Sequence, residues 1–205
     1  MAPFLSRIPT RGILPLSPTD PNQVPVLFLH GILGSPGNFE LPTTALAKHG
    51  RPFYAPAYGE HGTGALDISS HELLTYFDSL NVDKVDIVGH SAGGLLGLRL
   101  AQARPDKVRG LIGLGAAFRG VPRKIPLRPV VRMIGGEAVL QITKELPAEI
   151  PHGVRVISVI SNADRIVPAA SSELGQLVWI RGVRHEDLPR QTTVILRQLS
   201  DIAQG

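Results

Sequence analysis

Cysteine is absent from this chain of 205 residues, which excludes disulfide bonds and thiolate metal ligands. No apolar run approaches the roughly 18 residues of a membrane-spanning helix, so we expect no membrane span. The stretch from Met1 to Arg7 has neither a long apolar segment nor a small-residue cleavage site. It therefore predicts no secretory signal and a cytoplasmic location.

A strong charge of one sign is also missing, because 21 Lys and Arg stand against 17 Asp and Glu, for a net charge of +4. A basic excess can indicate nucleic acid or an anionic lipid surface. The one basic cluster comprises Arg119, Arg123, Lys124, Arg128 and Arg132. Prolines interrupt it, and no aromatic residues interleave it for base stacking. We interpret the cluster as solvated and predict no nucleic-acid partner, with weak contact to a lipid surface left open.

The composition, 43% hydrophobic and 19% charged, predicts one packed domain. Residues 1–23 are rich in Pro, Ser and Thr and predict an extended arm before a single domain at 24–205. Apolar runs predict strands at 24–29, 52–55, 85–88, 108–114, 154–160 and 177–180. Periodic patterns predict helices at 39–48, 68–80, 92–104, 136–146 and 189–203. This alternation predicts an α/β fold whose mostly parallel central sheet has helices on both faces.

The segment Gly89-His-Ser-Ala-Gly93 matches the G-x-S-x-G nucleophile elbow, and it lies between a predicted strand and a predicted helix. The sharp turn of such an elbow leaves room only for small residues beside the serine. The free amides at the start of the next helix favour developing negative charge. Ser91 is therefore the candidate nucleophile. In the alternative, the glycines form an ordinary tight turn and Ser91 caps the helix.

A serine nucleophile needs a base and an acid that orients the base, and after an elbow of this kind the acid precedes the histidine in the chain. Of the two histidines after Ser91, His152 precedes a predicted strand, whereas His185 follows one and so lies at the carboxyl edge, where α/β sites form. Asp164 also follows a strand. We therefore predict His185 as base and Asp164 as acid. Asp164 could instead pair with Arg165 or cap a helix, which would leave Glu145 and Glu149 as candidate acids.

The oxyanion of a tetrahedral intermediate needs preorganised N–H donors. The residue after the nucleophile, Ala92, supplies one. The loop after the first predicted strand reads His30-Gly-Ile-Leu-Gly34, and its Ile32 N–H is the predicted second donor. In the alternative, this loop is a tight loop with no catalytic role. No spaced His, Asp or Glu cluster suggests a metal, and we expect no cofactor.

With these residues in place, the chain resembles bacterial triacylglycerol lipases of the α/β-hydrolase superfamily, of the small, lidless lipase and esterase type. The resemblance runs from about Val24 to Ala203. Its most specific pieces are Val26-Leu-Phe-Leu-His-Gly-Ile-Leu-Gly34, Lys84-Val-Asp-Ile-Val-Gly-His-Ser-Ala-Gly-Gly94, Leu111-Ile-Gly-Leu-Gly-Ala-Ala-Phe-Arg-Gly120, Asn162-Ala-Asp-Arg-Ile-Val167 and Gly182-Val-Arg-His185. The resemblance implies hydrolysis of a small-molecule ester or lipid through an acyl-enzyme, without a cofactor. It also implies a triad of Ser91, Asp164 and His185 with oxyanion amides at Ile32 and Ala92.

Two questions stay open at this point. The first is the reaction, because the same triad serves thioesterases, acyltransferases and peptidases, and a hydrolase fold can also serve a non-catalytic binding protein. The second is the stretch 119–151, which has more apolar residues than a solvent loop needs. We expect part of it to form a small cap over the site, hinged at Gly135-Gly136, or else to pack a helix onto the flank of the sheet.

Overall fold

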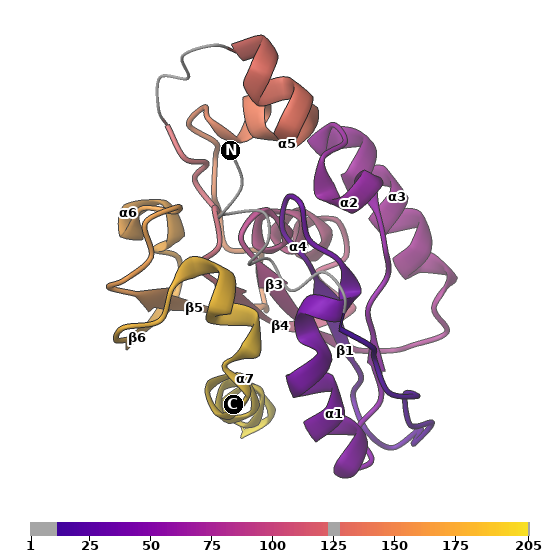
Figure 1. Ribbon diagram of the computed structural model, residues 1–205. Coiled ribbons are helices and arrows are strands. Elements are labelled where there is room, and N and C mark those ends of the chain that lie inside the picture. Colours follow the sequence, from indigo (N-terminus) through magenta and orange to yellow (C-terminus); the bar gives the residue numbers. More distant parts are fainter. Residues whose placement is uncertain (1–11, 123–127, 205) are drawn as a thin grey trace.

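The computed structural model describes residues 12–122 and 128–204, and its elements form a parallel sheet between two layers of helices (Figure 1). The six strands lie in the order β2-β1-β3-β4-β5-β6, and every neighbouring pair is parallel. The strands are β1 Val26–Leu29, β2 Phe53–Tyr54, β3 Val85–His90, β4 Val108–Leu114, β5 Arg155–Ser161 and β6 Gln176–Ile180. The predicted α/β class and parallel sheet are confirmed.

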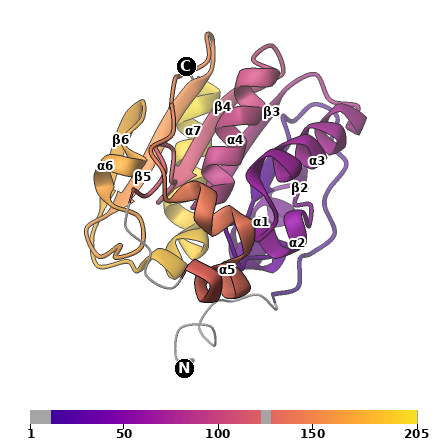
Figure 2. The same cartoon turned by 90° about the horizontal axis from the view of Figure 1, so that it is seen from above.

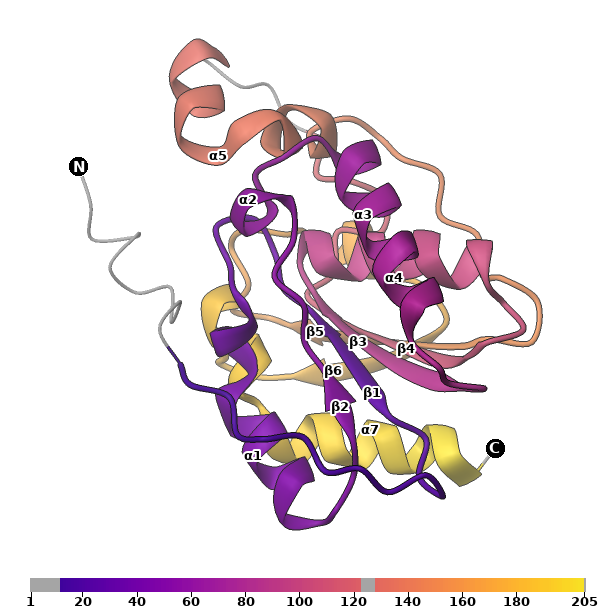
Figure 3. The same ribbon diagram turned by 90° about the vertical axis from the view of Figure 1, so that its right-hand side faces the viewer.

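The helices are α1 Glu40–Lys48, α2 Gly59–Gly62, α3 Leu66–Ser79, α4 Ala92–Ala103, α5 Arg128–Ile142, α6 Ala169–Ser172 and α7 Thr192–Gln204. Two short 3-10 helices, η2 Pro36–Phe39 and η3 His185–Arg190, precede α1 and α7. Helices α3 and α4 lie side by side on one face of the sheet, and α1 and α7 cover the other face (Figures 2 and 3).

Two apolar cores follow from the alternation of side chains along the strands. Leu27 and Ile87 face α3 and α4, whereas their neighbours Phe28 and Val88 face α1 and α7. All four side chains are buried. Strands buried on both faces read as continuous apolar runs, which is why β1 was visible in the sequence.

The bounds of several elements differ from the predicted ones for identifiable reasons. Strand β1 begins at Val26 rather than at residue 24, and Pro25 has no N–H to donate to a neighbouring strand. The terminal helix begins at Thr192 rather than at 189, because residues 185–190 form η3. The helix predicted at 136–146 instead begins at Arg128 and ends at Ile142, with a kink at Gly136.

The N-terminal arm is described from residue 12 onward, and residues 12–20 contain no helix or strand. Its Ser17 Oγ accepts the N–H of Phe53 at 2.8 Å, so the arm lies against β2 at the edge of the sheet. The remainder of the predicted arm lies outside the described residues.

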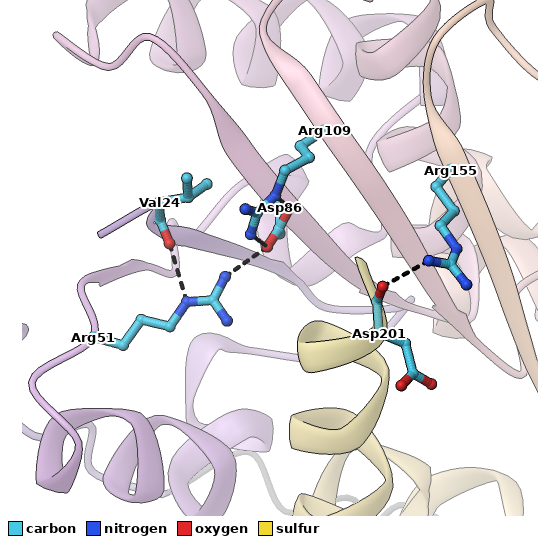
Figure 4. Close-up of polar contacts among 6 residues, drawn as sticks. All are labelled: Val24, Arg51, Asp86, Arg109, Arg155 and Asp201. Atoms are coloured by element: carbon cyan, nitrogen blue, oxygen red, sulfur yellow. Dashed lines mark hydrogen bonds and ion pairs between the residues drawn. The ribbon is translucent and has the colours of Figure 1, made fainter. Parts of the chain in front are cut away.

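A buried carboxylate joins the strands at the edge of the sheet opposite their carboxyl ends (Figure 4). Asp86 lies near the start of β3 and its side chain is fully buried. Arg109 from β4 donates to both of its oxygens, at 2.9 and 2.6 Å, and Arg51 donates to it at 2.5 Å. Arg51 also donates to the carbonyl of Val24. These bonds supply the charged partners that a buried carboxylate needs, and they join four segments of the chain.

Candidate active site

The sheet has one position where its strand order reverses, and the loop with Ile32 and the turn with Ser91 lie there. The chain passes from β1 outward to β2 and then returns to the other side of β1 as β3. In open parallel sheets, ligands bind at the carboxyl ends of the strands at such a switch point. The loop 30–34 follows β1 and Ser91 follows β3, so the two segments are neighbours. A Cβ added to Gly31 would lie 2.9 Å from the Cβ of Ser91.

Ser91 occupies a strained turn between β3 and α4. Its φ of 55° and ψ of −124° lie in a region that L residues rarely adopt. Its backbone N–H donates to the carbonyl of Leu114 at 3.1 Å, and its carbonyl accepts the N–H of Ala117 at 3.1 Å. Its side chain makes no capping hydrogen bond to α4, so the capping alternative has no support. The fold therefore holds the serine in place through its backbone and leaves its hydroxyl available.

The glycines on either side of Ser91 are required by close packing. A Cβ at Gly89 would lie 2.5 Å from the carbonyl oxygen of Gly93. A Cβ at Gly93 would overlap the carbonyl oxygens of Leu29 and His30. Both glycines therefore let the start of α4 approach the strands directly, as the G-x-S-x-G pattern predicts.

Asp164 and His185 come together at the carboxyl edge, after β5 and β6 respectively. The Nδ1 of His185 lies 2.7 Å from Asp164 Oδ2, and the two side chains are only 8% and 3% exposed. The other oxygen of Asp164 accepts the N–H groups of Ile166 and Val167 at 2.8 and 2.9 Å. The helix-capping alternative is not borne out, because α6 begins at Ala169 with Pro168 as its N-cap. One oxygen of Asp164 instead closes a local turn, while the other bonds to His185. Among the described residues, Asp164 forms no ion pair with Arg165.

His90 directly precedes Ser91 and packs against His185. It was not singled out from the sequence. Its ring packs against that of His185 with centroids 4.6 Å apart, and its Nε2 lies 3.0 Å from the carbonyl oxygen of His185. That oxygen only accepts, so Nε2 of His90 carries a proton. Burial, aided by the charge of His185, moves the pKa of His90 well below its usual value. Within the described part of the chain, no hydrogen bond joins the Ser91 hydroxyl to His185. Catalytic bonds of this kind often tighten only with substrate.

Gly115 is a second residue that the sequence did not single out. It follows β4 with a φ of +51°, and a Cβ there would lie 2.7 Å from Asp164 Oδ2 and 3.2 Å from His185 Nδ1. The pair of Asp164 and His185 therefore rests directly on the backbone of Gly115. The sequence contained only an indirect signal, a glycine immediately after a buried strand.

The two predicted oxyanion donors are both unused. Ala92 is the first residue of α4, where an N–H has no partner within the helix. Neither the Ala92 N–H nor the Ile32 N–H donates to another described residue. Both follow residues that lie side by side, Ser91 and Gly31. Two free N–H groups beside a serine match the donor arrangement of an oxyanion hole.

Among the described residues, the remaining candidates form no hydrogen bond or ion pair with Asp164 or His185. His152 precedes β5 at the opposite edge of the sheet, and Glu145 and Glu149 are exposed. Among residues 12–122 and 128–204, no group of three or more His, Asp or Glu is placed to hold a metal ion. No helix in the same residues is long and apolar enough to cross a membrane.

The apolar residues of 119–151 divide into two groups. Ala138 and Ile142, in the second half of α5, are buried at 0% and 6% exposure and belong to the core beside α3 and α4. Met133 and Ile134, before the kink, are 80% and 43% exposed. Two further apolar residues of this stretch, Ile125 and Leu127, lie outside the described residues. The second half of α5 therefore packs on the fold, whereas Met133 and Ile134 before the kink are exposed.

The kink of α5 lies against the loop that follows β2. A Cβ at Gly136 would overlap the carbonyl oxygen of Thr63, which also accepts the N–H of Ala138 at 3.2 Å. Gln141 accepts the N–H of Leu66 at 2.7 Å. Helix α5 accordingly lies beside α2, in the part of the molecule that contains the loops after the strands (Figures 1 and 3).

A parallel sheet with a strained serine after one strand and a buried histidine–aspartate pair after two others has the architecture of a hydrolase. The chain matches the model of the alpha/beta hydrolase family over residues 26–179, and it belongs to that family.

Individual relatives are more distant. The acetyltransferase component of an acetoin-cleaving system from Pseudomonas putida is 33% identical over 107 residues, which cover 47% of this chain and 29% of that protein. This chain spans well under half the length of the curated relatives that it matches. An esterase from a marine microorganism superposes with a TM-score of 0.71 at 18% identity, over 91% of this chain and 97% of that one. A monoacylglycerol lipase from Paleococcus ferrophilus gives 0.67 at 18% identity, over 93% and 98%.

Proposed function

We propose that this protein hydrolyses carboxylic esters through an acyl-enzyme on Ser91. The observation that carries the proposal is the buried bond of 2.7 Å between His185 and Asp164, at the same edge of the sheet as the strained serine. A serine hydroxyl is a poor nucleophile until a base takes its proton. A histidine whose Nδ1–H is held by a carboxylate presents its Nε2 lone pair for that task.

In the proposed reaction, His185 Nε2 accepts the hydroxyl proton of Ser91 as the oxygen attacks the ester carbonyl. The imidazolium then returns this proton to the leaving alcohol, which departs as the acyl-enzyme forms. A water molecule, deprotonated by His185, then attacks the acyl carbon. The bond from that carbon to Ser91 Oγ breaks, the imidazolium returns the proton to Oγ, and the carboxylic acid leaves. Asp164 keeps the ring in one tautomer and stabilises its positive charge in both steps.

The negative charge of each tetrahedral intermediate falls on the former carbonyl oxygen. The unused N–H groups of Ile32 and Ala92 are the proposed donors to that oxygen. Donors fixed by the backbone need no rearrangement as the charge develops, and each such donor contributes roughly 10²–10³-fold to kcat in serine hydrolases. The start of α4 adds a favourable dipole at the same point.

The reaction class is tested with p-nitrophenyl esters from acetate to palmitate, an emulsified triglyceride, and matched thioester and amide substrates. We expect turnover of the oxyesters that Ser91→Ala abolishes, and labelling of the wild type but not of Ser91→Ala by a fluorophosphonate. Faster turnover of the thioester than of every oxyester would identify a thioesterase instead. An unlabelled wild-type protein would favour the non-catalytic binding protein.

We further propose that the first half of α5 acts as a small cap that contacts the acyl chain. The exposure of Met133 and Ile134 before the kink supports this role, because adjacent exposed apolar side chains can form a ligand-binding surface. Replacing both with serine should shift the preferred acyl length. Ile68, which is 68% exposed on α3, supplies the control substitution. An equal loss on all esters would contradict the cap.

A further inference from the structure

His30 has a buried polar side chain that makes one hydrogen bond among the described residues. It follows β1 directly and is 1% exposed. Its Nδ1 lies 3.0 Å from the carbonyl oxygen of Gly31, whereas its Nε2 has no partner among the described residues. Because a carbonyl oxygen only accepts, Nδ1 carries the proton and Nε2 keeps a bare lone pair. An unsatisfied nitrogen in the core is costly, so a histidine here must offset that cost in another way. The hydrogen bond to Gly31 is such a contribution, because an apolar residue could not make it.

The Gly31 carbonyl belongs to the same peptide unit as the Ile32 N–H. A trans peptide is planar, so its C=O and N–H point in opposite directions. Two donors hold this carbonyl, His30 Nδ1 at 3.0 Å and the N–H of Gly34 at 3.0 Å. Gly62, the last residue of α2, packs against it, where a Cβ would lie 2.6 Å from the oxygen. Fixing the carbonyl in this way fixes the direction of the Ile32 N–H.

Tyr58 holds His30 in turn. The two rings are stacked, with centroids 4.2 Å apart and an interplanar angle of 11°. The Tyr58 hydroxyl also donates a hydrogen bond to the backbone carbonyl of His30. Burial lowers the pKa of His30 to about 4, although the Gly31 carbonyl opposes the shift. The ring is therefore neutral at neutral pH, and its one proton stays on the side of Gly31.

We propose that His30 and Tyr58 are positioning residues of the acyl-transfer site, which aim the Ile32 N–H at the developing oxyanion through the carbonyl of Gly31. The inference rests on the proposed function, in which Ser91 forms the acyl-enzyme. Neither side chain touches the reacting atoms, so their loss should reduce kcat through misdirection of a donor and leave the KM for substrate nearly unchanged.

The test compares His30→Leu with His30→Asn. Leucine and asparagine have the same shape, and both lose the stacking on Tyr58, but the asparagine Nδ2–H can replace Nδ1–H as the donor to Gly31. We expect His30→Leu to lower kcat on p-nitrophenyl butyrate about 100-fold, with KM within roughly threefold. His30→Asn should recover most of that loss. Equal kcat values for the two variants would overturn the proposal.

Tyr58→Phe provides a milder test that keeps the stacked ring. We expect kcat to fall about tenfold, as for the loss of one bond that supports a donor. Tyr76→Phe, on the half-buried tyrosine of α3, is the matched control and should leave kcat unchanged. A wild-type kcat in Tyr58→Phe would refute the role of its hydroxyl. Full turnover by Ser91→Ala would instead refute the proposed function, so the two failures are distinguishable.

Discussion

Gly115→Ala should inactivate the protein without altering any residue of the proposed triad. The new methyl group would lie 2.7 Å from Asp164 Oδ2, 3.2 Å from His185 Nδ1 and 2.6 Å from Leu188 Cδ1. Ordinary contact needs more than 3.4 Å, so these atoms must move by several tenths of an ångström. The Leu188 methyl can rotate away. The Asp164 carboxylate cannot easily follow, because two backbone N–H groups hold its other oxygen.

The substitution has two expected effects. Backbone strain lowers the stability of the fold, and displacement of Asp164 from His185 lowers kcat. Alanine at a φ of +51° costs roughly 1–2 kcal/mol of stability. Displacing Asp164 from His185 costs activity, and misplacements approaching 1 Å in a catalytic site cost about 100-fold. Complete loss of the orienting carboxylate sets the upper bound, at roughly 10⁴-fold. We therefore expect kcat to fall between about 10²-fold and 10⁴-fold.

Gly153→Ala separates the two parts. Gly153 also has a positive φ, +77°, but a Cβ there would meet nothing within 4 Å. The control thus carries the backbone strain alone and should lose stability without losing kcat. The assay is kcat on p-nitrophenyl butyrate, with thermal unfolding to show that both variants are folded at the assay temperature. A folded Gly115→Ala with the kcat of Gly153→Ala would refute a catalytic role for the Asp164–His185 pair.

Three further predictions concern the acid, the ion cluster and the buried histidines. Asp164→Asn should lower kcat by up to roughly 10⁴-fold, and residual activity within about tenfold of wild type would place the acid elsewhere. Asp86→Asn should destabilise the fold by about 2–4 kcal/mol, less than for a wholly buried pair because both arginines are partly exposed. Its melting temperature should fall by roughly 5–15 °C with kcat unchanged at 25 °C, whereas an unchanged melting temperature would contradict the role of the cluster. Stability should also decline as the pH falls from about 6.5 towards 4. The pKa of His30 in the folded protein is about 4, and that of His90 is also well below its usual value. In this pH range both histidines therefore bind protons in the unfolded chain but stay neutral in the folded protein. The His30 share of this loss is roughly 3 kcal/mol at the acid end. Denaturant unfolding at several pH values should show that the free energy of unfolding falls less with decreasing pH for His30→Asn than for the wild type. The same pH dependence in both proteins would contradict this prediction.

Local patterns were sufficient for the sheet and for the elbow. Strand β1 is a continuous apolar run, and for β4 the predicted and observed bounds of Val108–Leu114 coincide. The elbow pattern depends on residues that are close in sequence, and its glycines are required by the turn itself. Asp164 and His185 could be predicted because parallel strands bring their carboxyl ends to one edge, so position after a strand is enough. Their roles stay predictions that the variants above test.

Features that depend on contact between distant segments were not visible in the sequence. His90 and His185 are 95 positions apart, and no local signal indicates that one ring packs on the other. Asp86 interrupts a buried strand, and its partners Arg51 and Arg109 are 35 and 23 positions away. The kink of α5 depends on Gly136 meeting the loop at Thr63, a contact that the pair of glycines did not reveal.

The wholly parallel sheet has a consequence for how the protein folds. Parallel neighbours cannot be joined by a tight hairpin, so each of the five strand pairs forms only after a long stretch of chain has closed. Sheets built from such distant pairings form slowly. The segments that carry Ser91, Asp164 and His185 follow three different strands, so they meet only when β3, β5 and β6 are all in place. Helix formation is much faster than this assembly. During refolding, helical circular dichroism should therefore recover before the proposed ester hydrolysis, so that turnover would report the last stage of folding.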